Sequence, residues 1–127
     1  MPSPTQRRGA LHESVAERVL VARGYRILER NWRGGGAEVD RIAWVDEVLC
    51  FVEVRSRVGE ASGSPEASVG RAKRLRLVRA ARAFLTRFPP GRLPMVRFDV
   101  VGVVLSDAGE VLAVRVVEDA FDEAGRP

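Results

Sequence analysis

The chain has 127 residues, of which 46% are hydrophobic and 30% carry a charge. This composition predicts one globular domain, residues 1–127, that is large enough to bury a hydrophobic core. No apolar run approaches the roughly 18 residues that span a bilayer, and the N-terminus lacks the apolar segment of a secretory signal. A membrane or secreted protein is therefore not expected.

The formal net charge is +4, and Cys50 is the only cysteine. A modest positive charge is a weak indication of a polyanionic partner such as nucleic acid. A single cysteine cannot form an internal disulfide, and Cys50 lies in an apolar run. We therefore expect a buried free thiol and a reducing, cytoplasmic location.

The first predicted elements are a helix and a strand. Residues 10–23 carry apolar side chains at near-helical spacing. Residues 25–32 have the composition of a short strand, and the glycines at 34–36 indicate a turn. Residues 1–8 and 119–127, at the two ends of the chain, are expected to fray.

Two further strands and a second helix follow. Residues 37–45 and 48–55 are predicted to be strands around a two-residue turn, Asp46-Glu47. A polar loop rich in glycine and serine, residues 58–65, comes next. The second helix is predicted over residues 66–88, because two prolines directly after it end the pattern.

The last predicted elements are two more strands, residues 96–105 and 111–117. The resulting order is αβββαββ. Three consecutive strands predict an antiparallel meander, and the helix after them crosses over to a fourth strand parallel to its neighbour. We predict an α/β domain with a central mixed sheet flanked by helices, its apolar runs at 48–52 and 100–104 covered on both faces. Asp99 is expected to bond to Arg97 or to a loop amide rather than to a metal.

Glu38, Asp40, Glu53 and Arg55 lie inside the apolar strands of the hairpin of residues 37–55, at the end away from its turn. With a two-residue turn, Asp40 lies opposite Glu53 and Glu38 lies opposite Arg55. Side chains alternate across a strand, so all four project from one face. Two carboxylates at this spacing repel each other and are costly to desolvate. We therefore expect positive charge to compensate them, from Arg55 and from a divalent cation.

Carboxylate oxygens are ligands that Mg²⁺ prefers. A metal so held can polarise a phosphoryl oxygen and generate hydroxide for attack, while a neighbouring cationic side chain stabilises the charge that develops on the phosphate. The hairpin thus has the groups needed for metal-assisted phosphodiester cleavage. The alternative is a hairpin edge held by salt bridges, with its carboxylates facing water.

Six ordered blocks of the sequence carry a family resemblance. They are GALHESVAERVLVARGY at 9–25, ILERNW at 27–32, AEVDRIA at 37–43, FVEVRSR at 51–57, VGRAKRL at 69–75 and RFDVV at 97–101. Together they cover most of the chain and resemble the YraN-like family of the PD-(D/E)xK endonuclease-like fold. The resemblance implies a restriction-endonuclease-like αβββαβ core and a relation to the Holliday-junction resolvases.

The resemblance also implies a metal site and a substrate. Asp40 and Glu53 would bind Mg²⁺ or Mn²⁺, with the backbone carbonyl of Val54 as a further ligand. Glu13, on the first helix, would approach the same site as a catalytic residue. The substrate would be DNA, in a branched or otherwise structured form. A homodimer is expected because the junction-resolving relatives pair symmetrically.

Arg55 stands where the superfamily has its signature lysine, so the resemblance assigns it a catalytic role, with Glu38 as a supporting acid that orients it. Arginine is always charged and cannot act as a base. The alternative function is therefore a catalytically inactive nucleic-acid-binding protein on a nuclease scaffold. A third hypothesis is a small interaction domain without a nucleic-acid partner.

The second predicted helix lies in a strongly basic part of the chain. Residues 67–98 include nine basic residues and no acidic one. Four of them are expected to bind nucleic-acid phosphates: Arg71, Lys73, Arg76 and Arg79. The alternative is a solvated helix face whose long side chains cover the core. Lys73, the only lysine, could also supply an ammonium group to the carboxylates if this helix borders them.

Overall fold

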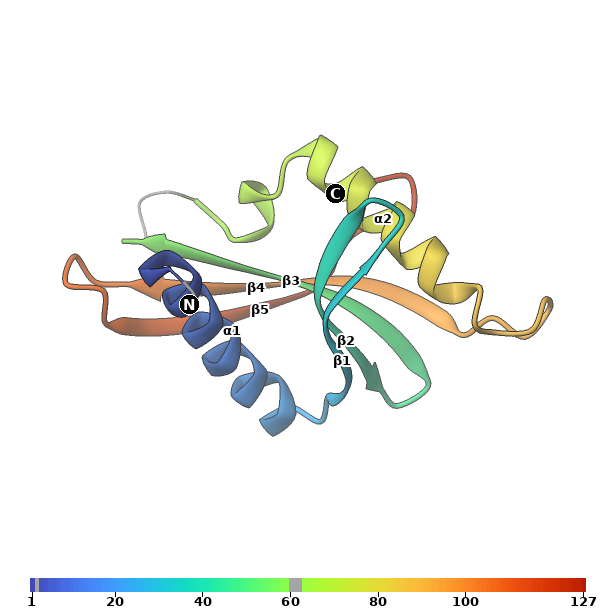
Figure 1. Cartoon of the computed structure of the whole chain (residues 1–127), viewed down its shortest axis with the longest axis horizontal. Helices are drawn as coiled ribbons and strands as arrows, with labels where there is room; N and C mark the ends of the chain where they lie inside the picture. The colour runs from blue at the N-terminus through green and yellow to red at the C-terminus, as the bar shows by residue number, and fades with distance from the viewer. Residues whose placement is uncertain (2, 60–62) are drawn as a thin grey trace.

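A five-stranded sheet forms the centre of the fold, in the order β1-β2-β3-β4-β5 (Figure 1). The computed structural model describes residues 1, 3–59 and 63–127. Its elements are α1 (Pro4–Ala22), β1 (Arg26–Gly34), β2 (Ala37–Val45), β3 (Val48–Val58), η1 (Glu66–Ser68), α2 (Arg71–Leu85), β4 (Met95–Leu105) and β5 (Val111–Phe121). Strands β3 and β4 are parallel, and the other neighbours are antiparallel. The predicted α/β class and the parallel crossover are confirmed.

Neither helix begins at the residue that the apolar periodicity predicts. α1 begins earlier, at Pro4, because Ser3 and Gln6 form a capping box in which each side chain accepts a hydrogen bond from the other's backbone N–H. α2 begins later, because the chain is extended at Val69 and Gly70 after the 3₁₀ turn η1. Neither helix in the described ranges is long and apolar enough to cross a membrane.

Each face of the sheet is covered by one helix. On β3, Phe51 belongs to the cluster beneath α2. The neighbouring Cys50 and Val52 belong to the cluster beneath α1, with Leu20 at its centre. This alternation follows from the period of two along a strand. It confirms that the central strands are covered on both faces and that Cys50 is a buried free thiol.

Strands β2 and β3 pair over only part of their length. The predicted two-residue turn is present, and the predicted register holds as far as the last pair, Arg41 and Val52. Beyond it, β2 continues against β1 and β3 continues against β4. The β1–β2 hairpin curves toward α2 (Figure 1), which opens the sheet between β2 and β3. We call this opening the fork, and Asp40 and Glu53 are the first residues within it.

The tip of the β1–β2 hairpin packs against α2. Gly35 has a φ of +60°, and a Cβ atom there would lie 2.8 Å from the carbonyl oxygen of Arg79, so the position requires glycine. Farther along the hairpin, Trp32 packs edge-to-face on Phe84, with 5.2 Å between the ring centroids. These contacts fix the hairpin against α2 and keep the fork open.

Candidate functional site

The fork brings the side chains of Asp40 and Glu53 together. Alternation along β3 places Glu53 on the same face as Phe51, toward α2. The Glu53 carboxyl is close enough to Asp40 to raise its pKa. The backbone N–H of Val54 also donates a hydrogen bond to Asp40 Oδ2, at 2.8 Å. The Asp40 side chain thus takes the place of the β2 backbone as the partner of this β3 amide.

Glu53 is buried and Asp40 is half-buried, so both carboxyls are largely removed from water. The Glu53 side chain is only 4% exposed, and its Oε2 atom has no hydrogen-bond partner among the described residues. Burial, and then the neighbouring Glu53 carboxyl, raise the pKa of Asp40 to about 8, against smaller lowering effects of the Val54 N–H and of Lys73. A proton or a cation between the carboxyls would relieve their repulsion.

Among the described residues, Lys73, and not Arg55, forms an ion pair with these carboxyls. Lys73 lies in the first turn of α2 and places its Nζ atom 3.4 Å from Glu53 Oε2. Arg55 is held by Ser68, with Nε 3.4 Å from the Ser68 hydroxyl and Nη2 3.4 Å from its carbonyl oxygen. The second helix therefore borders the carboxylates, which was the condition for Lys73 to reach them.

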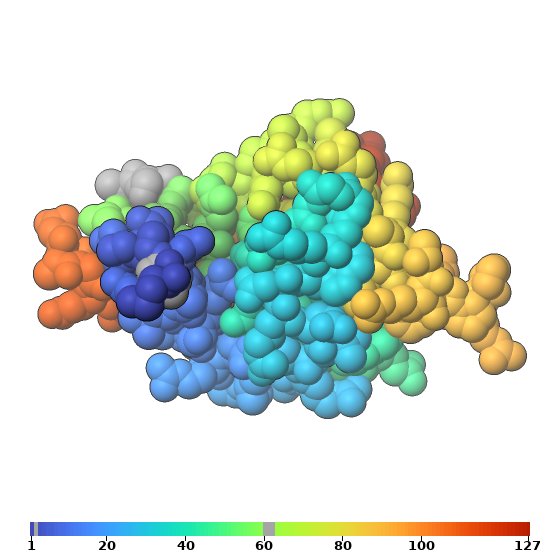
Figure 2. Space-filling view, viewed as in Figure 1, coloured from blue at the N-terminus to red at the C-terminus, as the bar shows by residue number. Residues whose placement is uncertain are grey.

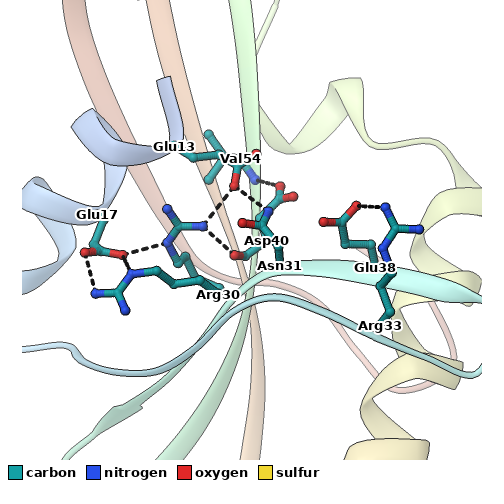
Figure 3. Close-up of polar contacts among 9 residues, drawn as sticks. Glu13, Glu17, Arg30, Asn31, Arg33, Glu38, Asp40 and Val54 are labelled. Atoms are coloured by element: carbon teal, nitrogen blue, oxygen red, sulfur yellow. Dashed lines mark hydrogen bonds and ion pairs between the residues drawn. The ribbon is translucent and has the colours of Figure 1, made fainter. Parts of the chain in front are cut away.

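Glu13 approaches the fork from α1, which covers the opposite face of the sheet (Figure 3). Its Oε1 atom accepts hydrogen bonds from Asn31 Nδ2 at 2.8 Å and from Arg41 Nη1 at 2.9 Å. Burial, and then the negative charge of Asp40, raise the pKa of Glu13. The structure thus brings Glu13 close enough to Asp40 for their charges to interact.

Asn31 and Arg41 belong to the site, although the sequence pattern does not identify them. Asn31 has a φ of 51°, a left-handed conformation that asparagine tolerates better than most residues. Arg41 is only 5% exposed, and besides Glu13 it donates to Glu17 and to the carbonyl oxygen of Asp40, both at 2.7 Å. The available signal for Arg41 was a guanidinium inside a strand that is otherwise largely apolar. The pattern offers no such signal for Asn31.

Glu38 does not lie opposite Arg55, as the extended register predicts. Because β2 leaves β3 at the fork, Glu38 is paired with Arg33 of β1, with 3.5 Å between Oε2 and Nη2 (Figure 3). The Arg33 side chain is 80% exposed, so this contact is at the surface. Of the four charges that the predicted register places on one face, the fork keeps Asp40 and Glu53 together and separates the other two.

The basic residues of α2 point in different directions. Arg71, Arg76 and Arg79 are exposed and form no ion pair with a described residue. Arg74 points inward, where Nε donates to the carbonyl of Gly125 and Nη1 donates to another backbone carbonyl, both at 2.6 Å. Figure 2 shows α2 beside the β1–β2 hairpin on one face of the molecule. The exposed arginines therefore add positive charge to the same helix that carries Lys73.

The donor atoms at the fork suit a hard divalent cation. Asp40 and Glu53 offer carboxylate oxygens, and Val54 offers a backbone carbonyl next to Glu53. In residues 1, 3–59 and 63–127, no three side chains of Asp, Glu, His or Cys converge as a metal cluster. Water would therefore complete the coordination, as Mg²⁺ commonly requires. Glu53 Oε2, which has an ion pair with Lys73 but no hydrogen bond among the described residues, is the atom that such an ion would satisfy.

Asp99 is a structural acid outside this site, as the sequence predicts. Its side chain is fully buried. It accepts hydrogen bonds from Arg97 Nε at 2.8 Å, from the Tyr25 hydroxyl at 2.6 Å and from the backbone N–H of Asp119 at 2.9 Å. These bonds join β4 to β5 and to the residue before β1.

The fold and the fork define a mixed α/β protein whose architecture is consistent with a restriction-endonuclease-like core and whose carboxylate pair lies where the sheet divides. The chain belongs to the Uncharacterised protein family UPF0102, whose sequence profile matches residues 12–103. That range includes Glu13, Asp40, Glu53 and Lys73. The predicted resemblance is confirmed at the level of this family.

Three relatives illustrate the extent of the similarity. A UPF0102 protein of Anaeromyxobacter sp. (strain Fw109-5) is 42% identical over 94% of this chain and 88% of its own length. One of Moorella thermoacetica is 43% identical over 95% of this chain and 100% of its own. One of Myxococcus xanthus is 42% identical over 94% of each chain. The similarity therefore extends over nearly the whole chain.

Proposed function

We propose that this protein is a divalent-metal-dependent nuclease that hydrolyses phosphodiester bonds in DNA. The observation that carries the proposal is the Asp40–Glu53 pair, in which a half-buried and a buried carboxyl lie close together, one oxygen lacks a hydrogen bond and an ammonium lies beside it. Buried carboxylates are costly unless positive charge compensates them. A purely structural hairpin edge would leave these groups in water, so the burial favours a functional site.

The residues at the fork have distinct tasks in this proposal. Asp40, Glu53 and the carbonyl of Val54 would hold Mg²⁺ or Mn²⁺. When bound, this ion supplies Lewis-acid chemistry, which draws electron density from a phosphoryl oxygen and makes water a better nucleophile. Glu13 is the proton acceptor, because its raised pKa brings it closer to the working pH of a general base. Arg55 contributes positive charge without acting as a base.

Arg71, Arg76 and Arg79, which are exposed on α2, would bind the DNA backbone. Their phosphate contacts would be independent of sequence and sensitive to salt. The relation to the PD-(D/E)xK junction-resolving enzymes, which comes from the sequence blocks, supports a branched or structured DNA substrate and a homodimer. The buried free thiol of Cys50 suits the reducing cytoplasm.

Cleavage assays test the proposal directly. Labelled duplex, single-stranded and four-way-junction DNA would each be incubated with the protein and Mg²⁺ or Mn²⁺. We expect product from at least one substrate and none in EDTA. Asp40→Asn and Glu53→Gln should each abolish cleavage while thermal melts show that both variants are folded. Absence of product from all three substrates with both metals would reject the catalytic proposal.

The position of Arg55 favours a second candidate function, a catalytically inactive nucleic-acid-binding protein. Its guanidinium cannot act as a base, and it contacts Ser68 instead of the carboxylates. This candidate predicts salt-dependent DNA binding without metal-dependent turnover. Cleavage by Arg55→Lys, together with none by the wild type, would support it. Cleavage by the wild type would exclude it.

A further inference from the structure

Lys73 is the only lysine among 21 basic residues, and it is the basic residue that contacts the carboxylate pair. Its side chain is 32% exposed, whereas that of its partner Glu53 is 4% exposed. The ammonium therefore lies at the boundary between the buried carboxylates and solvent. A compact ammonium on a flexible stem can leave such a position and move toward a ligand more easily than a guanidinium fixed by several hydrogen bonds.

The other nearby cations are held by other groups. Arg55 is bonded to Ser68. Arg41 lies on the α1 side, where it is bonded to Glu13 and to a second glutamate. Arg74 is bonded to two backbone carbonyls. Among the described residues, Lys73 is thus the cation that can exchange between the carboxylates and a ligand at the mouth of the fork.

The Lys73 ammonium faces a different charge at the fork with and without a bound metal ion. Without metal, the Lys73 ammonium lies 3.4 Å from Glu53 Oε2 and offsets negative charge on the carboxyl pair. With a divalent cation bound, the two ionised carboxylates are neutralised by the ion alone, and the ammonium is left in excess. A phosphodiester carries one negative charge and would neutralise that excess.

We infer that the Lys73 ammonium is an exchangeable counter-ion, which neutralises the Asp40–Glu53 pair until a divalent cation replaces it and then contacts a phosphate of the substrate. This inference rests on the proposed function and deepens it by giving Lys73 a role distinct from the surface arginines of α2. It also means that Lys73 opposes metal binding while it promotes substrate binding.

Metal affinity is the first test of the inference. Lys73→Met removes the ammonium and keeps the length of the side chain. Arg82→Met removes one charge from an exposed residue of the same helix that does not contact Glu53, and is the matched control. Calorimetric titration with Mn²⁺ at pH 8 should give a dissociation constant roughly threefold to tenfold lower for Lys73→Met than for the wild type, because a like charge beside the ion is removed. The control should remain within about twofold.

If Lys73 were only structural, its loss would damage the fold and weaken Mn²⁺ binding. A lower dissociation constant in Lys73→Met therefore indicates the counter-ion role. Lys73→Arg keeps the charge and should stay close to the wild type. An unchanged or weaker Mn²⁺ affinity in Lys73→Met would overturn the inference.

Salt dependence of DNA binding is the second test. Fluorescence anisotropy with labelled junction DNA, in Ca²⁺ instead of Mg²⁺ and over a range of NaCl concentrations, gives the slope of log affinity against log salt. Loss of one phosphate contact should reduce this slope by about 0.9 in Lys73→Met, whereas Arg82→Met should keep it. Equal slopes for the wild type and Lys73→Met would also overturn the inference.

The two experiments separate failure of this inference from failure of the proposed function. If the wild type binds neither Mn²⁺ nor DNA, the proposed function fails and the inference fails with it. If the wild type binds both, and Lys73→Met behaves like Arg82→Met in both titrations, only the counter-ion role is rejected.

Discussion

Asp40 ionises at a much higher pH in the folded chain than in the unfolded chain, because it is buried beside Glu53. The unfolded carboxyl has a pKa of 3.8, and the folded one has a pKa of about 8. Between these values the unfolded chain releases a proton that the folded chain keeps, so the stability of the metal-free protein falls as the pH rises. Above the folded pKa both states are ionised and the loss is complete.

Asp40→Asn should therefore stabilise the metal-free protein in a pH-dependent way. Asparagine cannot ionise, and its oxygen can still accept the hydrogen bond from the Val54 N–H. In EDTA, the melting temperature of the variant should match that of the wild type near pH 4 and exceed it by about 5 °C or more at pH 8. Thermal melts at both pH values measure the difference. A difference that does not change with pH would contradict the raised pKa.

Arg41 is the buried cation on the α1 side of the fork, and its removal should be strongly destabilising. Arg41→Met leaves Glu13 and Glu17 without their buried partner, which should lower the free energy of unfolding by about 3 kcal/mol. Arg30→Met removes an exposed partner of the same Glu17 and should cost much less. Urea denaturation compares the two variants, and equal losses would show that burial of Arg41 is not what matters.

At the scale of the element, the site depends on how the β1–β2 hairpin packs on α2. The hairpin carries Asp40 and α2 carries Lys73, and the hairpin tip at Gly35 lies directly against the backbone of α2. A change at the hairpin tip should therefore affect the fork without touching the carboxylates.

Gly35→Ala and Gly36→Ala form a matched pair that tests this dependence. Both glycines have positive φ, so either substitution strains the backbone by about 1 kcal/mol. Only at Gly35 would the new Cβ meet the backbone of α2, whereas at Gly36 nothing lies within 4 Å. Gly35→Ala should therefore show the larger loss of stability in urea denaturation and weaker Mn²⁺ binding in calorimetry. Equal effects of both variants would mean that the tip contact does not support the site.

The elements were predictable where local chemistry decides them. Strand β2 and its turn agree with the sequence-based prediction, because a two-residue turn between alternating strands sets both register and face. The start of α2 was not predictable in this way, because apolar periodicity continues through Val69 and Gly70 while the backbone is extended there. The early start of α1 has a local signal in the sequence, the capping box of Ser3 and Gln6, which the apolar periodicity does not include.

The candidate site was predictable only where it lies within one hairpin. Asp40 and Glu53 follow from the register. The contact between Lys73 and Glu53 depends on how α2 crosses the sheet, which no local pattern specifies. Likewise, Asn31 and Arg41 join the site through α1, and Glu38 leaves it because β2 curves away from β3.

At the scale of the whole molecule, charge is distributed unevenly. The net charge is only +4, but the carboxylates at the fork are buried or half-buried, while four of the five α2 arginines are exposed. A polyanion approaching the protein therefore meets the positive helix before it meets the acids. Such a distribution favours binding that is strong at low salt and weak at high salt.

A triple variant, Arg71→Gln with Arg76→Gln and Arg79→Gln, tests this distribution. If each arginine contacts one phosphate, the slope of log affinity against log salt should become shallower by about 2.7. Fluorescence anisotropy with labelled DNA measures the slope. A matched variant, Arg23→Gln with Arg26→Gln and Arg92→Gln, removes three exposed charges outside α2 and should change it less. Equal changes in both variants would indicate that only net charge matters.

The length of the turn between β2 and β3 determines which β2 side chains share a face with Glu53. Five paired positions separate the Asp46-Glu47 turn from the fork. Insertion of a single residue that slides one strand past the other would exchange the faces of Asp40 and Arg41, because side chains alternate with a period of two. Glu53 would then face a guanidinium in place of a second carboxyl. Length changes in this turn can thus convert an anionic pocket into a neutral ion pair without altering any residue within it.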